Sequence, residues 1–311
     1  MTTEALSSLI LAHYPLVPTS IHPTERGFFG ETFCVETSHA RYFAKCDGWK
    51  EHQREFQHSL PWVHTLTQAG LSFVPRVIPT NDHALFVEQN GVIVALFEYV
   101  DGIHTEEYPL SWLFEKLALV YQTVPVAPQT APFTSAVYDE FCARRAALCM
   151  DDPIERQAAS LLDTKETLFA KHRQKLEYWT RQINCLSLPT VLTHGDAGGN
   201  CILHDQTLSI IDWDSVRPAP PERDAWFFMH RPAQTAEIEE ALARAGFPYR
   251  LHPEAFAYYA YHSFFYYLCE HLRAIQSSTG KQKEKQLHLL EQYFPSWIWD
   301  QLQAADEVPE Q

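Results

Sequence analysis

The sequence predicts an α+β fold, with a small, mostly antiparallel sheet and one inserted helix in the first 100 residues and a larger helical part after residue 105. Two observations support this prediction. From about residue 19 to 46, and again in two runs before residue 100, apolar and polar residues alternate, which is the period of half-buried strands. After residue 105 the apolar residues recur at helical spacing instead. The chain of 311 residues, 46% of them hydrophobic, can bury a substantial core.

Charge and composition narrow the class of protein. The formal net charge of −15 disfavours nucleic acid or an anionic membrane as the main partner, because both require a positive surface. It is compatible with a cationic substrate, and equally with solubility alone. The N-terminus lacks a basic region and a cleavage site, and no apolar run is long enough to span a membrane, so we expect a cytoplasmic protein. The seven widely spaced cysteines indicate reduced thiols.

The N-terminal part is predicted from local patterns. The Asn90-Gly91 pair between two apolar runs is a strong hairpin signal, because both residues tolerate a positive φ. The apolar face Phe56, Leu60, Val63 and Leu66 marks the inserted helix. The predicted elements are a helix at 1–17, strands between 19 and 46 with a turn at 38–39, a helix at 49–67, and strands at 84–88 and 92–99.

The C-terminal part is predicted as a series of helices. Asp151-Asp152-Pro153 has the composition of a helix N-cap and precedes a long apolar stripe. Residues 256–267 are aromatic on nearly all sides, so we expect a buried helix there. The predicted helices lie at 111–121, 136–150, 154–183, 222–229, 233–245, 253–276 and 282–303.

Residues 191–224 carry the residues with the clearest chemical role. Asp196 lies on a polar loop, Asn200 follows four residues later, and Asp212 ends the second of two short apolar strands. One carboxylate orienting a hydroxyl, with a carboxamide and a second carboxylate holding Mg²⁺ on phosphates, is an arrangement suited to phosphoryl transfer.

The first part of the chain could supply the remaining groups for such a site. Lys45 ends a strand, and Glu55 lies on the following helix; a strand lysine paired with a helix glutamate contacts nucleotide phosphates in kinase-type sites. Gly27 and Gly30 at a strand turn could let backbone N–H groups approach a phosphate. A surface lysine and ordinary turn glycines are the alternative interpretation of these residues.

Taken in order, these segments resemble the aminoglycoside phosphotransferase family, the small-molecule branch of the protein-kinase-like fold. The resemblance is carried by HGDAGGN (194–200), IIDWD (210–214), YFAK (42–45), Glu55 and LFEYVDG (96–102). The run DWDSVRPAPPERD is also similar to the spectinomycin phosphotransferase type. The resemblance implies a two-lobed fold, with a nucleotide-binding lobe at 1–100, a hinge at 98–102 and a helical lobe at 103–311 that holds the catalytic loop and acceptor site.

The resemblance also implies a role for individual residues and the use of ATP or GTP with Mg²⁺. Asp196 is expected to be the catalytic base. Asn200 and Asp212 are expected to bind the metal, with Asp214 as a second candidate. The other implied roles are phosphate contact by Lys45 positioned by Glu55, a phosphate-covering turn at Gly27 and Gly30, adenine contact by the backbone of Glu98 and Val100, structural support by His194 and Asp224, and an acceptor site near Trp226.

The loop between Asp196 and Asn200 departs from the family pattern. The family has four intervening residues, whereas this chain has three, Ala197-Gly198-Gly199. Glycines can adopt backbone angles closed to other residues, so we expect Gly198 and Gly199 to bridge the shorter gap.

The predicted function is an ATP- and Mg²⁺-dependent kinase for a hydroxyl of a small, cationic molecule, such as an aminoglycoside or aminocyclitol antibiotic, with a role in antibiotic resistance. The short connection from Asp212 to Asp224 disfavours a protein kinase, which needs a polypeptide-binding platform there. The alternatives are a kinase for choline, homoserine or another metabolite, and a catalytically inactive nucleotide-binding protein. A metal hydrolase built on His194, Asp196 and Asp212 is disfavoured, because no histidine pair has ligand spacing.

Overall fold

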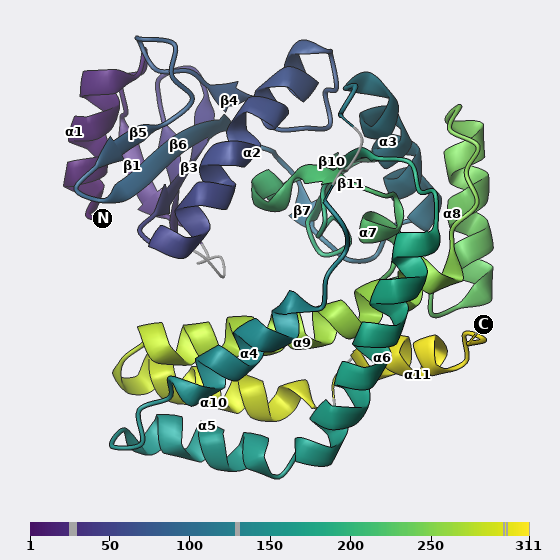
Figure 1. Ribbon diagram of the computed structural model, residues 1–311. Helices are drawn as coiled ribbons and strands as arrows, with labels where there is room; N and C mark the ends of the chain where they lie inside the picture. Colours follow the sequence, from purple (N-terminus) through teal and green to yellow (C-terminus); the bar gives the residue numbers. More distant parts are fainter. Residues whose placement is uncertain (25–29, 128–130, 295, 297, 311) are drawn as a thin grey trace. The chain divides into compact units, whose positions relative to one another are not determined.

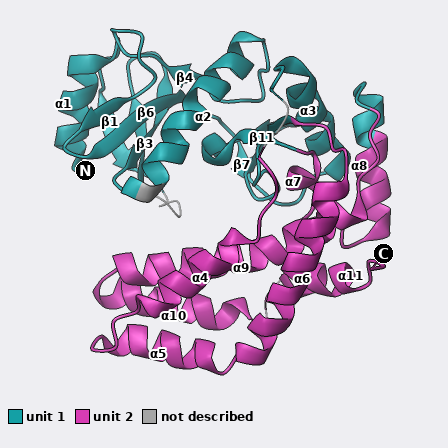
Figure 2. Cartoon of the chain, in the orientation of Figure 1, with its two compact units in different colours: residues 1–127, 191–219, 241–247 teal, residues 128–190, 220–240, 248–311 magenta. Residues whose placement is uncertain are grey.

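The computed structural model describes residues 1–24, 30–127, 131–294, 296 and 298–310, and Figure 1 shows its helices and strands. The chain forms two compact units, coloured in Figure 2. Unit 1 comprises Met1–Ala127, Val191–Ala219 and Ala241–Phe247, and unit 2 comprises Pro128–Thr190, Pro220–Glu240 and Pro248–Gln311. These units differ from the predicted lobes, because residues 191–219 group with the N-terminal sheet; the division into lobes stays a prediction.

An antiparallel sheet forms the N-terminal part of unit 1. Its strands run in the order β1-β2-β3-β6-β4, and β5 also pairs with β6. The strands are β1 (Ser20–Pro23), β2 (Glu31–Glu36), β3 (Arg41–Asp47), β4 (Val77–Ile78), β5 (Val87–Gln89) and β6 (Val92–Glu98). The hairpin prediction is confirmed, because Asn90 (φ 54°) and Gly91 (φ 76°) form a turn between β5 and β6.

Side chains alternate between the two faces of this sheet. Helix α1 (Thr3–His13) covers one face, where Leu6 and Ile10 pack in a buried cluster with Ala44 and Cys46 of β3. Because successive strand residues point to opposite faces, Lys45 points to the other one. There its ammonium lies 5.6 Å from the centre of the Phe56 ring, on helix α2 (Lys50–Gln68).

The remainder of unit 1 places a β-hairpin beside a helix. Strands β9 and β10 form the hairpin, β7 pairs with β9, and β8 pairs with β11. Gly102 enters β7 with φ 139°, and a Cβ there would meet the Leu203 carbonyl oxygen at 2.6 Å, so only glycine fits this crossing. The elements are β7 (Ile103–His104), α3 (Leu110–Thr123), β8 (Val191–Thr193), β9 (Cys201–His204), β10 (Thr207–Ile210), the 3₁₀ turn η1 (Trp213–Ser215) and β11 (Arg217–Ala219).

Unit 2 is helical, with an aromatic interior. Phe141, Phe169, Phe264 and Phe265 are at most 1% exposed. Helix α9 contributes many of the buried aromatic side chains, which confirms the prediction of a buried helix. The helices are α4 (Ala136–Ala146), α5 (Pro153–Asp163), α6 (Glu166–Cys185), α7 (Glu222–Ala225), α8 (Pro232–Arg244, which continues into unit 1), α9 (Pro253–Ser277), α10 (Gly280–Tyr293) and α11 (Ile298–Asp306).

The α+β prediction is confirmed, but three helix boundaries were wrong. The helix predicted at 154–183 is divided into α5, which ends at Asp163 with Thr164 as its C-cap, and α6, which begins at Glu166. The helix predicted at 282–303 is divided into α10 and α11, and the one at 222–229 is limited to α7. Within the described residues, no helix has the length and apolar character required to cross a bilayer.

Candidate active site

The loop after β8 is held by the imidazole of His194. Its Nδ1 accepts a hydrogen bond from the Asp196 backbone N–H at 3.2 Å, and its Nε2 lies 2.9 Å from the Ile211 carbonyl oxygen. Because a backbone N–H can only donate, Nδ1 must be unprotonated and Nε2 must carry the hydrogen. The ring is fully buried and packs edge-on against Trp213, 4.5 Å between ring centres. His194 therefore fastens the loop to the end of the hairpin.

The structure brings Asp196 and Asn200 together. The Asn200 amide Nδ2 donates to the Asp196 carbonyl oxygen at 2.7 Å and lies 3.1 Å from its carboxylate Oδ2. Gly198 and Gly199 bridge the shorter gap without a positive φ at either residue. The loop is closed instead by a turn in which the Asn200 N–H donates to the Ala197 carbonyl at 3.1 Å.

Two side chains that the sequence interpretation missed hold the same loop. The Tyr108 hydroxyl donates to the Gly198 carbonyl at 2.5 Å, and the His104 Nε2 lies 2.8 Å from the Gly199 carbonyl. Both residues follow the predicted hinge, on β7 and the segment before α3. No local motif marks them, because their function depends on the pairing of β7 with β9.

The hairpin places Asp212 next to this loop. Cys201 pairs with Ile210 at its open end, and the Ile211 N–H donates to the Asn200 carbonyl at 2.9 Å, so Asn200 lies opposite Ile211. Asp212 then adopts φ 61° and ψ 57°. This left-handed conformation is uncommon outside glycine and is tolerated by aspartate. The turn separates Asp212, whose side chain is 46% exposed, from Asp214, whose side chain is 10% exposed.

Lys45 lies between these two carboxylates. Its ammonium donates to Asp212 Oδ1 at 2.6 Å and to Asp214 Oδ2. Burial alone would lower the pKa of Lys45, but the two carboxylates outweigh it and raise that pKa. Burial likewise opposes ionisation of Asp212, yet Lys45 holds its pKa below the usual range. Burial raises the pKa of Asp214 to about 6; Lys45 opposes this shift and the neighbouring Asp212 adds to it.

The structure does not bring Glu55 to Lys45. Glu55 is exposed on α2, and no hydrogen bond or ion pair joins it to the lysine within the part of the chain that the structure describes. His52, one turn earlier, faces the site instead: its Nδ1 lies 2.6 Å from Asp47 Oδ2 and its Nε2 lies 3.6 Å from Asp214 Oδ2. Burial would lower the pKa of His52, but the hydrogen bond to Asp47 and the charge of Asp214 raise it.

The predicted hinge contains a backbone amide that is available for a ligand. The Glu98 N–H donates to the Arg76 carbonyl at 2.8 Å, whereas the Val100 N–H has no partner among the described residues. The side chains of Glu98 and Arg76 form an ion pair at 2.6 Å and help line a cavity of about 670 Å³ beside the hinge.

The structure leaves the predicted roles of the two turn glycines, Asp224 and Trp226 untested. Gly30 has φ 78°, and a Cβ there would meet the Cys46 carbonyl oxygen at 2.5 Å, so packing against β3 already requires glycine. Gly27 lies outside the described residues. Asp224 and Trp226 are both buried in unit 2, at the end of α7, so their expected roles stay predictions.

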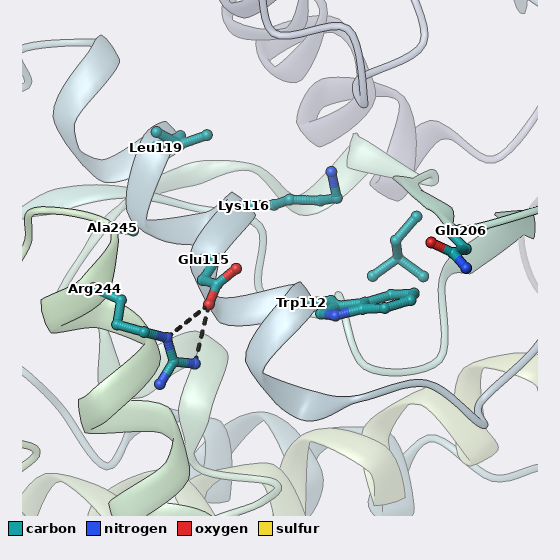
Figure 3. Close-up of a pocket in the computed structure, with 8 residues that line it drawn as sticks. Trp112, Glu115, Lys116, Leu119, Gln206, Arg244 and Ala245 are labelled. Atoms are coloured by element: carbon teal, nitrogen blue, oxygen red, sulfur yellow. Dashed lines mark hydrogen bonds and ion pairs between the residues drawn. The ribbon is translucent and has the colours of Figure 1, made fainter.

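A second cavity in unit 1, of about 520 Å³, is shown in Figure 3. It is formed by α3, the β9–β10 turn and the end of α8, and the Glu115–Arg244 ion pair at 3.0 Å joins two of these elements. None of the predicted site residues lines it.

Comparison with known proteins identifies the fold and the family. Comparison with curated protein sequences gave no match. Among solved structures, the chain is similar to spectinomycin phosphotransferase APH(9)-Ia in complex with ADP and spectinomycin (TM-score 0.76, 14% identity, 99% of this chain and 98% of that one). It is also similar to amicoumacin kinase hAmiN in complex with AMP-PNP, Ca²⁺ and Ami (TM-score 0.60, 11% identity, 98% of this chain and 93% of that one).

A third similar structure is choline kinase LicA from Streptococcus pneumoniae (TM-score 0.58, 13% identity, 94% of this chain and 98% of that one). At these identities the likeness establishes the fold alone, and it confirms the predicted kinase-like fold. The profile of the phosphotransferase enzyme family (APH) matches residues 20–260, which is more than half of the chain. The resemblance predicted from the sequence motifs is therefore confirmed, and the chain belongs to the phosphotransferase enzyme family.

Proposed function

We propose that this protein is an ATP- and Mg²⁺-dependent kinase that transfers the γ-phosphate to a hydroxyl of a small, cationic molecule. The observation that carries the proposal is the grouping of Asp196, Asn200, Asp212 and Lys45 within unit 1. Asn200 contacts the Asp196 carboxylate directly. Its backbone pairs with Ile211, the residue before Asp212, and Asp212 forms the ion pair with Lys45. Phosphoryl transfer depends mainly on positioning and charge stabilisation, and these side chains supply both.

Asp196 is the residue proposed to orient the acceptor hydroxyl and accept its proton. Its side chain is exposed at the loop surface, where a substrate can reach it, while its backbone N–H is fixed by His194. The contact to Asn200 holds the carboxylate at one end of the loop. An aspartate with a fixed backbone and an accessible carboxylate meets the geometric requirement for a general base.

The residues beside Asp196 suit a magnesium ion. Asn200 offers an amide oxygen and Asp212 a partly exposed carboxylate, and oxygen ligands are those that Mg²⁺ prefers. Among the described residues no three His, Cys, Asp or Glu side chains are arranged to hold a metal by themselves, so a bound ion would also take oxygens from the nucleotide or water. Asn200 and Asp212 would hold the ion, whose charge would offset part of the negative charge of the phosphates.

Lys45 and the hinge are proposed to bind the nucleotide. The lysine ammonium is held in place by Asp212 and Asp214 and can share its hydrogens with phosphate oxygens. The unpaired N–H of Val100 is available to an adenine nitrogen. The complexes of similar structures with ADP and AMP-PNP support a nucleoside triphosphate as the donor.

The net charge of −15 favours a cationic acceptor. Spectinomycin, amicoumacin and choline, which appear in the names of similar proteins, define the range of acceptors to test, although none is assigned to this chain.

The test measures ATP turnover by purified protein with Mg²⁺ and a panel of spectinomycin, aminoglycosides, choline, homoserine and simple alcohols. Phosphorylated product is identified by mass spectrometry. We expect Asp196→Asn to lower kcat by about 10²- to 10⁴-fold, because it removes the general base, while ATP affinity is retained. The matched control is Asp205→Asn, the same change at a 92% exposed residue in the hairpin turn. Equal product formation by wild type and Asp196→Asn would contradict the proposal, and ATP binding without product for any acceptor would favour an inactive nucleotide-binding protein.

A further inference from the structure

A row of buried ionisable side chains connects helix α2 to Lys45. It runs from Asp47 at the end of β3, through His52 in the first turns of α2, to Asp214 in η1, and then to the Lys45 ammonium. The side chains of Asp47, His52, Lys45 and Asp214 are 0%, 4%, 9% and 10% exposed, respectively. Buried ionisable groups are costly unless they are paired, so four of them in contact with one another indicate a specific arrangement.

Asp47 fixes the orientation of the His52 ring. Its Oδ1 accepts the Trp49 backbone N–H at 2.7 Å, so the carboxylate is anchored at the start of α2. Its Oδ2 lies 2.6 Å from His52 Nδ1. An ionised carboxylate can only accept, so Nδ1 carries a hydrogen and donates it. The ring is also stacked on Phe56, with an interplanar angle of 13°.

This fixed ring directs Nε2 towards Asp214, 3.6 Å away. Asp214 in turn binds the Lys45 ammonium. A glutamate at position 52 would place a carboxylate against that of Asp214, and like charges at this distance repel. The helix side chain that fits here must therefore be a donor or a cation, the opposite polarity to the glutamate expected from the sequence.

We propose that His52, oriented by Asp47, positions Asp214 and through it the Lys45 ammonium for nucleotide binding. His52 is a positioning residue, because it acts through Asp214 and does not contact Lys45 in this chain of interactions. Both aspartates bind the Lys45 ammonium; Asp214, the more buried of the two, is the one that His52 positions, and Asp212 is the one proposed to bind the metal. The inference rests on the proposed function, since it assumes that Lys45 binds nucleotide phosphates.

The test uses two substitutions of similar size that separate the two ring nitrogens. His52→Gln can place a donor near the position of Nε2, whereas His52→Asn can place one only near Nδ1. ATP affinity is measured by calorimetry with Mg²⁺ and without acceptor, together with the thermal midpoint. We expect His52→Asn to weaken ATP binding about tenfold, the order of effect seen for partners that orient a binding residue, and His52→Gln to remain within about threefold of wild type.

Two further variants complete the test. His52→Glu reverses the polarity and is expected to weaken ATP binding by more than tenfold, in line with loss of an orienting partner. His58→Gln is the matched control at an exposed position of the same helix, and it should bind ATP as wild type does. In turnover assays the weaker ATP binding of His52→Asn and His52→Glu should appear as a higher KM for ATP, with KM for the acceptor unchanged.

Equal ATP affinity in wild type, His52→Asn and His52→Glu would overturn the inference. It would also be overturned if His52→Gln and His52→Asn lost the same affinity, because packing alone would then explain the effect. If His52→Glu fails to fold, the comparison of the glutamine and asparagine variants still decides. Failure of the proposed function appears differently, as a wild-type protein that does not bind ATP or does not transfer phosphate.

Discussion

Two buried histidines, one in each unit, lie in different surroundings and have pKa values shifted in opposite directions. His52 in unit 1 lies between the carboxylates of Asp47 and Asp214, and these raise its pKa against the effect of burial. His172 in unit 2 packs against the rings of Phe264 and Tyr261, and burial lowers its pKa to about 4. The same side chain is part of a charged network in one unit and of an aromatic core in the other. A buried histidine can therefore belong to a charged network or to an aromatic core, and the groups packed around it decide the direction in which its pKa shifts.

The largest effect on stability is expected from the aromatic core of unit 2. Phe141 is 1% exposed and packs against Phe169, 5.0 Å between ring centres. Phe141→Ala should lower the free energy of unfolding by about 3–5 kcal/mol, because it removes buried contacts and leaves a cavity. Urea unfolding measures the loss, and ATP affinity of the folded protein should not change.

The matched control for this change is Phe227→Ala in the same unit, where the ring is 38% exposed. Phe227→Ala should lower the free energy of unfolding by well under half as much as Phe141→Ala, because less buried apolar area is lost. Equal losses of stability for the two variants, or a loss of ATP affinity in Phe141→Ala, would contradict the separation of the aromatic core of unit 2 from the candidate site in unit 1.

The second-largest effect is expected in the pH dependence of stability. His172 has its pKa lowered to about 4 by burial and by the nearby Lys171, against an ordinary value of 6.5. The folded protein thus binds fewer protons than the unfolded chain between these values, so stability falls as the pH falls from about 6.5 to about 4. Between pH 7 and pH 5 this histidine should account for a loss of about 2 kcal/mol.

Replacing the histidine tests this assignment. His172→Phe keeps an aromatic ring in the cluster and should reduce the loss of stability between pH 7 and pH 5, measured by urea unfolding at each pH. His39→Phe, at an exposed position in unit 1, is the control and should leave the pH dependence as it is in wild type. An unaltered pH dependence in His172→Phe would remove His172 from the explanation.

The smallest effect is expected from an exposed ion pair. Arg244 and Glu115 are 52% and 41% exposed, so the pair is largely solvated. Arg244→Gln should cost at most about 1 kcal/mol, and less at high salt. Thermal unfolding at low and high salt measures this, with Arg231→Gln at another exposed position as control. A loss of stability as large as that of Phe141→Ala would contradict the description of this contact as a solvated ion pair.

Local patterns in the sequence were sufficient for much of the fold. The Asn90-Gly91 turn and the Asp152 N-cap are confirmed, because each depends on the preferences of a few adjacent residues. The helix breaks at Thr164 and before α11 were missed, since an apolar stripe can continue across a short interruption of the backbone. Periodicity indicates which face is buried and does not fix where a helix ends.

The candidate site was predicted where its residues are close in the sequence, and missed where they are distant. Asp196, Asn200 and Asp212 lie within one loop and one hairpin, so their proximity follows from local geometry. Glu55 was chosen for its charge, but the apolar stripe of α2 extends back from Phe56 to His52 by four residues, and that spacing was the available signal. The bonds from His104 and Tyr108 to the loop depend on strand pairing between distant segments, which no local pattern reveals.

Gly102 limits how the predicted hinge of this protein can change. Its Cα passes so close to β9 that a Cβ would lie 2.7 Å from the Ile202 side chain and closer still to the Leu203 carbonyl. Both its φ and this contact exclude other residues, so a substitution would separate β7 from the hairpin. The carbonyls that His104 and Tyr108 bind would then lose their support together. A single glycine therefore couples the end of the predicted hinge to the loop that carries Asp196 and Asn200.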